Sequence, residues 1–104
     1  MPVTTLDGRQ IHVNDEGFLT DPTEWNERLG DTLAAHIGIT LTDPHWKAIH
    51  FLRDYYTVKG ETPTIRRVST SGGIPVKELF RLFPGKPAKK MAYIAGLPKP
   101  HGCV

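Results

Sequence analysis

The sequence predicts an α+β fold, in which a small N-terminal antiparallel β-meander packs on a bundle of about five helices and a flexible C-terminal arm follows. Three observations predict it: an Asp7-Gly8 turn between two short segments, helix start signals that recur through the rest of the chain, and a proline- and glycine-rich ending. At 104 residues the chain suffices for one modest core. We expect a single domain over residues 1–104, with a mobile arm at 96–104.

The N-terminal residues predict a β-hairpin. Residues 3–6 and 9–13 flank Asp7-Gly8, a dipeptide that favours a type I′ turn because both central positions of that turn need positive φ. Apolar and polar residues alternate in the second segment, as in a strand with one solvated face. A second turn over 14–17 then completes the meander. We place His12 on the solvated face and do not assign it as a ligand.

Each helix is predicted from a start signal, an apolar repeat and a stop signal. Asp21-Pro22-Thr23-Glu24 has the pattern of a capping box with proline at the first helical position. The second helix carries so many apolar and aromatic residues that we expect it to be central, with its aromatic residues in the core. The expected helices start at Pro22, Thr42-Asp43-Pro44, Thr62-Pro63, Pro75 and Pro87, and end before Gly38, Gly60, Ser71, Pro84 and Gly96.

The third and fourth predicted helices carry Arg66, Arg67, Lys77 and Arg81 and are joined through Gly72-Gly73. Two basic helices joined by a glycine-containing turn also occur in helix-turn-helix DNA-binding proteins. Many helical domains have such a turn for packing alone. A DNA-binding regulator with a cysteine sensor is therefore an alternative of another class, which steeply salt-dependent duplex binding would support.

The charge is mildly basic, with a net charge of +2 and a pI near 8.8, and does not by itself indicate nucleic-acid binding. Acidic residues fall mainly in the first half, and we expect the face with the arm to be basic, although an ordinary solvated helix face gives the same bias. The basic residues of the second half are Lys59, Arg66, Arg67, Lys77, Arg81, Lys86, Lys89, Lys90 and Lys99.

The residue pattern argues against an internal disulfide, a metal site, a membrane span and a signal peptide. A lone cysteine cannot close an internal disulfide or form a structural zinc site by itself, and His45 and His50 are off the i, i+4 register of a metal pair. We assign no metal and no cofactor. No apolar run approaches the roughly 20 residues that span a bilayer, and the N-terminus lacks a signal-peptide pattern. We therefore expect a cytoplasmic protein.

The last nine residues, GLPKPHGCV, predict a stiff arm with a loose tip. Pro98 and Pro100 restrict φ, Gly96 ends the preceding helix, and Gly102 adds freedom just before Cys103. From Gly96 to the cysteine the extended backbone reaches roughly 20 to 25 Å, at about 3.3 Å per residue. A thiol on such an arm could enter another protein's pocket, whereas a frayed tail with an unused thiol is the plainer alternative.

Two stretches, RLFPGKPAK at 81–89 and IAGLPKPHGCV at 94–104, resemble the DsrC/TusE family of small sulfur-carrier proteins. The Asp-Gly hairpin, the turn at 16–19, Trp25, His45-Trp46, residues 51–56 and residues 63–66 also look like family positions. The resemblance implies a small antiparallel sheet against a helical bundle. It also implies that Cys103 carries sulfur as a persulfide.

The family has members of two kinds. Those that work with dissimilatory sulfite reductase have a second cysteine eleven positions earlier, which allows a disulfide or a trisulfide, and here that position is Ala92. The resemblance therefore favours a single-cysteine, TusE-like carrier, with a sulfite reductase-associated DsrC-type subunit as the alternative. Whether Ala92 is natural or engineered stays open. The segment 68–79 is shorter than the equivalent segment in many family members, and this segment can help form the surface that binds a partner.

The resemblance implies a sulfurtransferase only in the sense of a persulfide carrier, without stand-alone turnover. Its donors would be TusBCD/DsrEFH-like relay proteins, and its acceptor a tRNA thiolase that makes 2-thiouridine, a sulfite reductase or a sulfur-oxidation partner. The basic half would lie near tRNA without reading its sequence. Lys99 and His101 would favour the Cys103 thiolate, and Arg66 and Lys90 are further supporting candidates.

Overall fold

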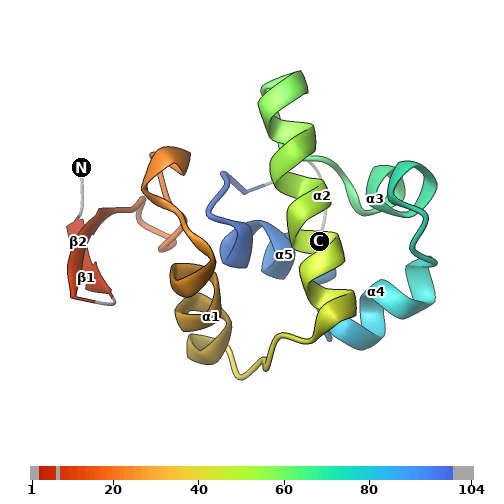
Figure 1. Cartoon of the computed structure of the whole chain (residues 1–104), viewed down its shortest axis with the longest axis horizontal. Coiled ribbons are helices and arrows are strands. Elements are labelled where there is room, and N and C mark those ends of the chain that lie inside the picture. Colours follow the sequence, from red (N-terminus) through yellow and green to blue (C-terminus); the bar gives the residue numbers. More distant parts are fainter. Residues whose placement is uncertain (1–2, 7, 100–104) are drawn as a thin grey trace.

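The computed structural model describes residues 3–6 and 8–99, and its element order confirms the predicted α+β fold (Figure 1). The hairpin lies at one end of the molecule, α3 and α4 lie at the other, and α2 and α5 lie between them. The elements are β1 (Val3–Leu6), β2 (Arg9–His12), the 3-10 helix η1 (Pro22–Glu24), α1 (Glu27–His36), α2 (Asp43–Lys59), α3 (Ile65–Gly72), α4 (Val76–Leu82) and α5 (Pro87–Ala95).

The two strands form the predicted hairpin. They pair antiparallel with Leu6 opposite Arg9, which leaves a two-residue connection in which Gly8 has a φ of 76°. A single antiparallel bridge between Val13 and Leu19 adds the third segment of the meander. The buried side chains of this region, together with Leu29 and Leu33 of α1, form a small core that attaches the sheet to the helices.

The first predicted helix is wrong in one respect, because it is interrupted at Trp25, where the backbone is extended. The Asp21 carboxylate accepts from the Thr23 amide and caps η1 alone, and the Asn26 side chain accepts from the Leu29 amide and starts α1 afresh. Glu24 forms no capping box; its carboxylate accepts from the amide of His12, 2.9 Å away. The interruption frees Trp25 to contact the end of α5.

Helix α2 is central, as predicted, and packs against both α5 and α3. It spans Asp43–Lys59 and is capped by Gly60, which has a φ of 73°. His45, for which no metal role is assigned, is buried near its start: Nδ1 accepts from the Thr42 amide at 3.1 Å, so Nε2 carries the proton and donates to the Leu82 carbonyl at 2.9 Å. His45 therefore joins α2 to the end of α4.

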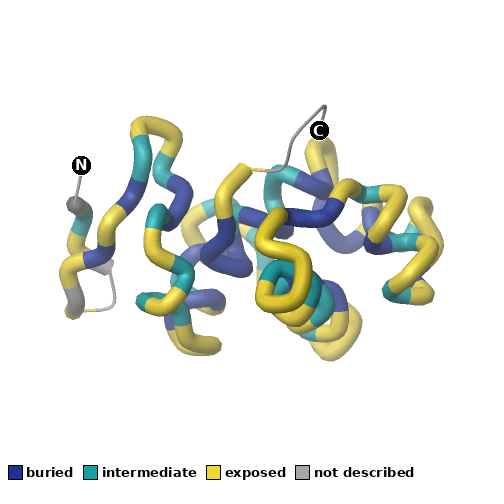
Figure 2. Tube along the Cα trace, turned by 90° about the horizontal axis from the view of Figure 1, so that it is seen from above, coloured by how far each residue is buried: buried dark blue, intermediate teal, exposed yellow. Residues whose placement is uncertain are grey.

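The third predicted helix is also corrected at its start. It begins at Ile65, because the Thr64 hydroxyl accepts from the Arg67 amide and Thr62 and Pro63 lie buried before it. The main core forms where α2, α3, α4 and α5 meet, and Figure 2 shows buried segments in the middle of the molecule with exposed segments around them. Within the part of the chain that the structure describes, no helix has the length and apolar content needed to span a membrane.

Candidate functional site

The described part of the candidate site is the root of the arm, residues 96–99. Two predicted site residues, Cys103 and His101, lie outside the described residues. The root follows α5 directly, so the contacts that end this helix also set where the arm starts.

Two of the last carbonyls of α5 are capped by the backbone itself. Gly96 has a φ of 71°, and its amide donates to the Tyr93 carbonyl at 3.3 Å, while the Leu97 amide donates to the Ala92 carbonyl at 3.1 Å. This pairing is a Schellman motif, in which a glycine in the left-handed conformation ends the helix. The Leu97 side chain is only 1% exposed, so the first residues after the helix belong to the core.

The other two carbonyls are bound by side chains from distant segments. Trp25 Nε1 donates to the Ile94 carbonyl at 2.7 Å, and Arg53 Nη1 donates to the Ala95 carbonyl at 2.6 Å. Arg53 Nη2 donates to the Pro22 carbonyl at 3.0 Å, and its guanidinium lies 4.3 Å from the centre of the Trp25 ring. All four carbonyls that a helix end leaves without intrahelical partners are thereby hydrogen-bonded.

The electrostatics of this arrangement favour a cation at the position of Arg53. The carbonyl end of a helix carries partial negative charge, so the guanidinium interacts favourably with the terminus of α5. Burial lowers the pKa of Arg53 from its ordinary value, yet arginine stays protonated in proteins. Its partners among the described residues are two carbonyl oxygens and an indole ring, with no carboxylate.

A third side chain holds the arm beyond the helix. The Thr62 hydroxyl, in the loop between α2 and α3, donates to the Pro98 carbonyl at 2.8 Å, and Thr62 is 9% exposed. Lys99, the next residue, is exposed, and its Nζ lies 3.4 Å from Oε2 of Glu16. The described root is thus anchored through Pro98, whereas mobility of the remainder of the arm stays a prediction.

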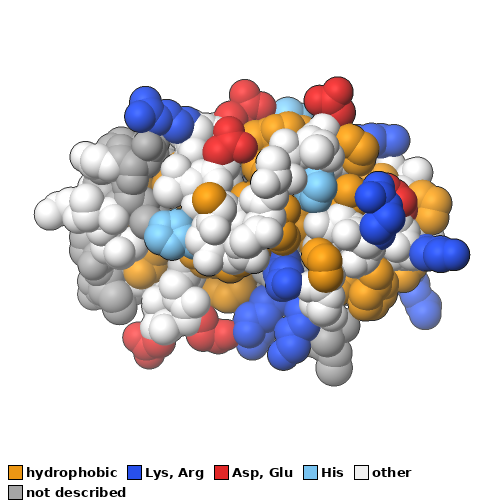
Figure 3. Space-filling view, turned by 90° about the horizontal axis from the view of Figure 1, so that it is seen from below, with side chains coloured by type: hydrophobic (Ala, Val, Ile, Leu, Met, Phe, Trp, Pro, Cys, Tyr) orange, Lys and Arg blue, Asp and Glu red, His pale blue; other side chains and the backbone are white. Residues whose placement is uncertain are grey.

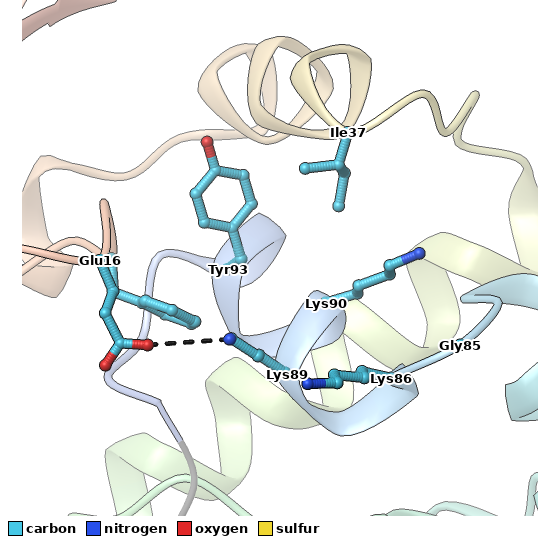
Figure 4. Close-up of a pocket in the computed structure, with 8 residues that line it drawn as sticks. Glu16, Ile37, Gly85, Lys86, Lys89, Lys90 and Tyr93 are labelled. Atoms are coloured by element: carbon cyan, nitrogen blue, oxygen red, sulfur yellow. Dashed lines mark ion pairs between the residues drawn. The ribbon is translucent and has the colours of Figure 1, made fainter.

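A cleft of about 480 Å³ is lined by the turn at 14–18, the residue that follows α1, the loop between α4 and α5, and α5 itself (Figure 4). Phe18, Ile37 and Tyr93 supply its apolar surface, and burial raises the pKa of Tyr93. Lys86, Lys89 and Lys90 supply its positive charge. Oε2 of Glu16, which contacts Lys99, also lies 3.7 Å from Nζ of Lys89, so the cleft and the arm share this carboxylate.

The predicted supporting residues fall in different places. Lys99 lies on the root, and Lys90 lines the cleft, where its ammonium donates to the Pro84 carbonyl. Arg66 is exposed on α3, and among the described residues no contact joins it to the root or the cleft. Figure 3 shows Lys and Arg side chains gathered near the lower middle of one face and again at its right-hand end.

The residues proposed for DNA contact are all exposed on α3 and α4. One of them, Arg81, forms an ion pair with Glu78 one helical turn earlier. In the part of the chain that the structure describes, no group of three or more His, Cys, Asp or Glu side chains is placed to hold a metal ion.

Sequence reasoning missed the roles of Arg53 and Thr62. Arg53 lies within the apolar and aromatic run of the central helix. A buried cation is costly unless it is hydrogen-bonded, so this position was the one sequence signal that Arg53 has specific partners. Thr62 precedes a proline and has the pattern of a helix start, which gives no sign of a contact between its hydroxyl and the arm. Neither partner, Ala95 nor Pro98, can be found from local sequence.

Comparisons with known proteins bear on the whole chain. The profile of the family described as "DsrC like protein" matches residues 5–104. The chain is 40% identical to "Sulfurtransferase TusE" of Yersinia pseudotuberculosis, over 95% of this chain and 98% of the relative. It is 37% identical to "Sulfurtransferase TusE" of Salmonella typhimurium, over 95% of this chain and 97% of the relative.

Solved structures give the same result. The NMR structure of Allochromatium vinosum DsrC superposes with a TM-score of 0.82 at 37% identity, covering 98% of this chain and 97% of that one. The crystal structure of the oxidized gamma-subunit of the dissimilatory sulfite reductase (DsrC) from Archaeoglobus fulgidus gives a TM-score of 0.82 at 37% identity, covering 99% and 100%. The likeness therefore extends over the sheet, the helices and the root of the arm.

Proposed function

The chain belongs to the DsrC-like family, and from this premise we propose that it relays sulfur as a persulfide on Cys103. Sulfur relay in general follows from relatives that are sulfurtransferases and from structural neighbours that are DsrC proteins. The observation that carries the proposal is the anchored root. It fixes the backbone through Pro98 and leaves the only cysteine of the chain five residues farther on.

The proposed transfer consists of two exchanges at sulfur. The Cys103 thiolate attacks the outer sulfur of a donor persulfide, forms Cys103-S-SH, and releases the donor thiolate. An acceptor thiolate then attacks the outer sulfur of Cys103-S-SH and releases the Cys103 thiolate. No electron is gained or lost over the two steps, since one sulfur–sulfur bond breaks as another forms.

The single-cysteine, TusE-like route is the setting we favour. Ala92 occupies the position of the second cysteine in the family's other members, and it is fully buried beneath the root of the arm. An alanine there cannot take the sulfur from Cys103 into an internal disulfide or trisulfide, so the sulfur must pass to another protein. This supports TusBCD/DsrEFH-like donors and a tRNA thiolase acceptor in the cytoplasm over a sulfite reductase-associated role.

Cations close to Cys103 in the sequence would support the thiolate that each step requires. Lys99 lies on the described root, and a cation close to a thiol lowers its pKa. His101 is proposed for the same role, and Lys90 would act from the cleft. Glu16 partly neutralises Lys99 in the free protein, so a partner that binds Glu16 would leave more positive charge beside the arm.

The DNA-binding alternative lacks comparable support. One of its four basic residues, Arg81, is paired with Glu78, and the relatives and neighbours are named for sulfur chemistry.

A relay assay tests the proposal. The chain is loaded with ³⁵S from labelled polysulfide, freed of excess label, and mixed with the reduced tRNA thiolase or with the reduced sulfite reductase of the same organism. We expect label to move to the thiolase and to be absent from Cys103→Ser throughout. If Cys103→Ser accepts and passes on label as the wild type does, the proposed carrier role is wrong.

A further inference from the structure

We infer that Arg53 and Thr62 are positioning residues for sulfur delivery, because together with Trp25 they fix the point at which the arm leaves the fold. The inference rests on the proposed carrier role of Cys103. It assigns to three side chains outside the arm the task of setting where the thiol can reach. We refer to Trp25, Arg53 and Thr62 as the root clamp.

Arg53 connects two segments that lie far apart in the sequence. Its two terminal nitrogens donate to Ala95 at the end of α5 and to Pro22 in η1. A planar guanidinium holds two acceptors in one fixed geometry, which a lysine ammonium on a flexible stem does not do. Because a carboxylate would supply a stronger partner than either carbonyl, this arrangement is suited to holding backbone in place rather than to balancing charge.

Thr62 holds the arm by the only backbone group that Pro98 offers. Proline has no amide hydrogen, so its carbonyl is the single point at which a side chain can hydrogen-bond this residue's backbone. The hydroxyl that binds it comes from a nearly buried threonine, where an unpaired polar group would be costly. The bond therefore extends the anchoring two residues beyond the helix cap.

The root clamp shortens the segment of the arm that can carry Cys103 away from the fold. Leu97 is buried in the core, and with Pro98 held as well the free segment begins at Lys99. The backbone from Lys99 to Cys103 then spans at most roughly 13 to 18 Å, at about 3.3 to 3.6 Å per residue. A segment of that length cannot bring the thiol to every part of the molecular surface, because the longest dimension of the molecule is 35 Å. A partner must then bind close to the root, beside Glu16 and the loop that carries Thr62.

The lone cysteine allows a direct test with the full chain. A nitroxide on Cys103 broadens the amide signals of nearby residues, and the pattern of signal loss reports where the arm spends its time. We compare Arg53→Lys with Arg81→Lys, a matched change on exposed α4, and Thr62→Val with Thr32→Val, whose hydroxyl also donates to a carbonyl. The two controls leave the root untouched.

We expect wild type and both controls to lose signal mainly around Glu16 and Thr62. In Arg53→Lys and Thr62→Val the loss should spread toward the hairpin and α4, the two ends of the molecule. A residue that only stabilises the fold would lower the melting temperature without redistributing the signal loss. If both variants are folded and neither pattern differs from its control, the inference is overturned. Should Arg53→Lys fail to fold, Thr62→Val decides alone.

Two further measurements separate this inference from the carrier proposal. The reaction of the unlabelled Cys103 thiol with a small disulfide reagent should be unchanged in the variants, because the clamp acts on position and not on the thiol. Loading by polysulfide should also be unchanged. Loss of loading in the wild type itself would count against the carrier role, whereas unchanged arm patterns in the variants would count only against the clamp.

Discussion

Gly96 lies directly against the ring of Trp25: a Cβ atom on this glycine would lie 2.5 Å from Cδ1 of the indole and 2.9 Å from its Cγ. The backbone at Gly96 is also left-handed, with a φ of 71°. Two independent requirements therefore select glycine here, the turn that ends α5 and the close approach of Trp25. The same tryptophan donates to the Ile94 carbonyl, so Trp25 contributes to the root clamp both by this hydrogen bond and by its contact with Gly96.

Replacing Gly96 with alanine should destabilise the fold more than a left-handed backbone alone explains. The left-handed conformation costs roughly 1 to 2 kcal/mol for a residue with a Cβ, and forcing that Cβ against Trp25 adds roughly 1 to 3 kcal/mol. Gly38 is the matched control, since it has a φ of 76° and a Cβ added there would meet nothing within 4 Å. Urea unfolding of Gly96→Ala and Gly38→Ala should show the larger loss at Gly96. Equal losses would mean that Trp25 yields without cost.

How far the sequence predicts this fold can be judged from the helix starts. Pro44, Pro87 and their following apolar repeats predicted α2 and α5, because their signals are local and lie within one turn of the helix start. The same type of signal at Asp21-Pro22 failed. There the Asp21 carboxylate is used by Thr23, and the Asn26 side chain offers a second cap that starts a new helix. The interruption between these two caps, which are five residues apart, lies at Trp25, whose hydrogen bond to the Ile94 carbonyl is a tertiary contact that no local pattern contains.

The candidate site likewise has a part that local sequence predicts and a part that it does not. The arm was predictable because its signal is a run of adjacent prolines, glycines and one cysteine. The root clamp was not, because Arg53 and Ala95 are 42 residues apart and Thr62 and Pro98 are 36 apart. Whether a polar side chain in an apolar helix binds solvent, a carboxylate or a distant carbonyl depends on the packing of the finished fold.

Acid should weaken the junction between the hairpin and η1. The amide and imidazole of His12 hold the pKa of Glu24 below its ordinary 4.5, and hydrogen bonds from Thr23 lower the pKa of Asp21 below 3.8. A lowered pKa means that the stabilisation is present above the ordinary value and is lost as pH falls through the folded-state value. The stability gap between wild type and Glu24→Gln should therefore shrink from about pH 6 to about pH 3. A gap that stays constant over this range would contradict the assignment.

Alkali should act through Tyr93 in the cleft. Burial raises its pKa above the ordinary 10.0, so the folded state holds this proton more tightly than the unfolded chain does. Stability from this group is complete below pH 10.0 and is lost as pH rises through the raised value. In a spectrophotometric titration, Tyr93→Phe should remove a phase that ionises above pH 10.0. Loss of a phase at or below pH 10.0 instead would show that Tyr93 is open to solvent.

The carrier role of Cys103 is tested most directly by intact-protein mass. Wild type and Cys103→Ser are incubated with a persulfide donor and measured before and after reduction. The account predicts a gain of about 32 Da, one sulfur atom, that appears in the wild type, disappears on reduction and is absent from Cys103→Ser. No gain in the wild type from polysulfide or from a protein donor, or an equal gain in Cys103→Ser, would contradict it.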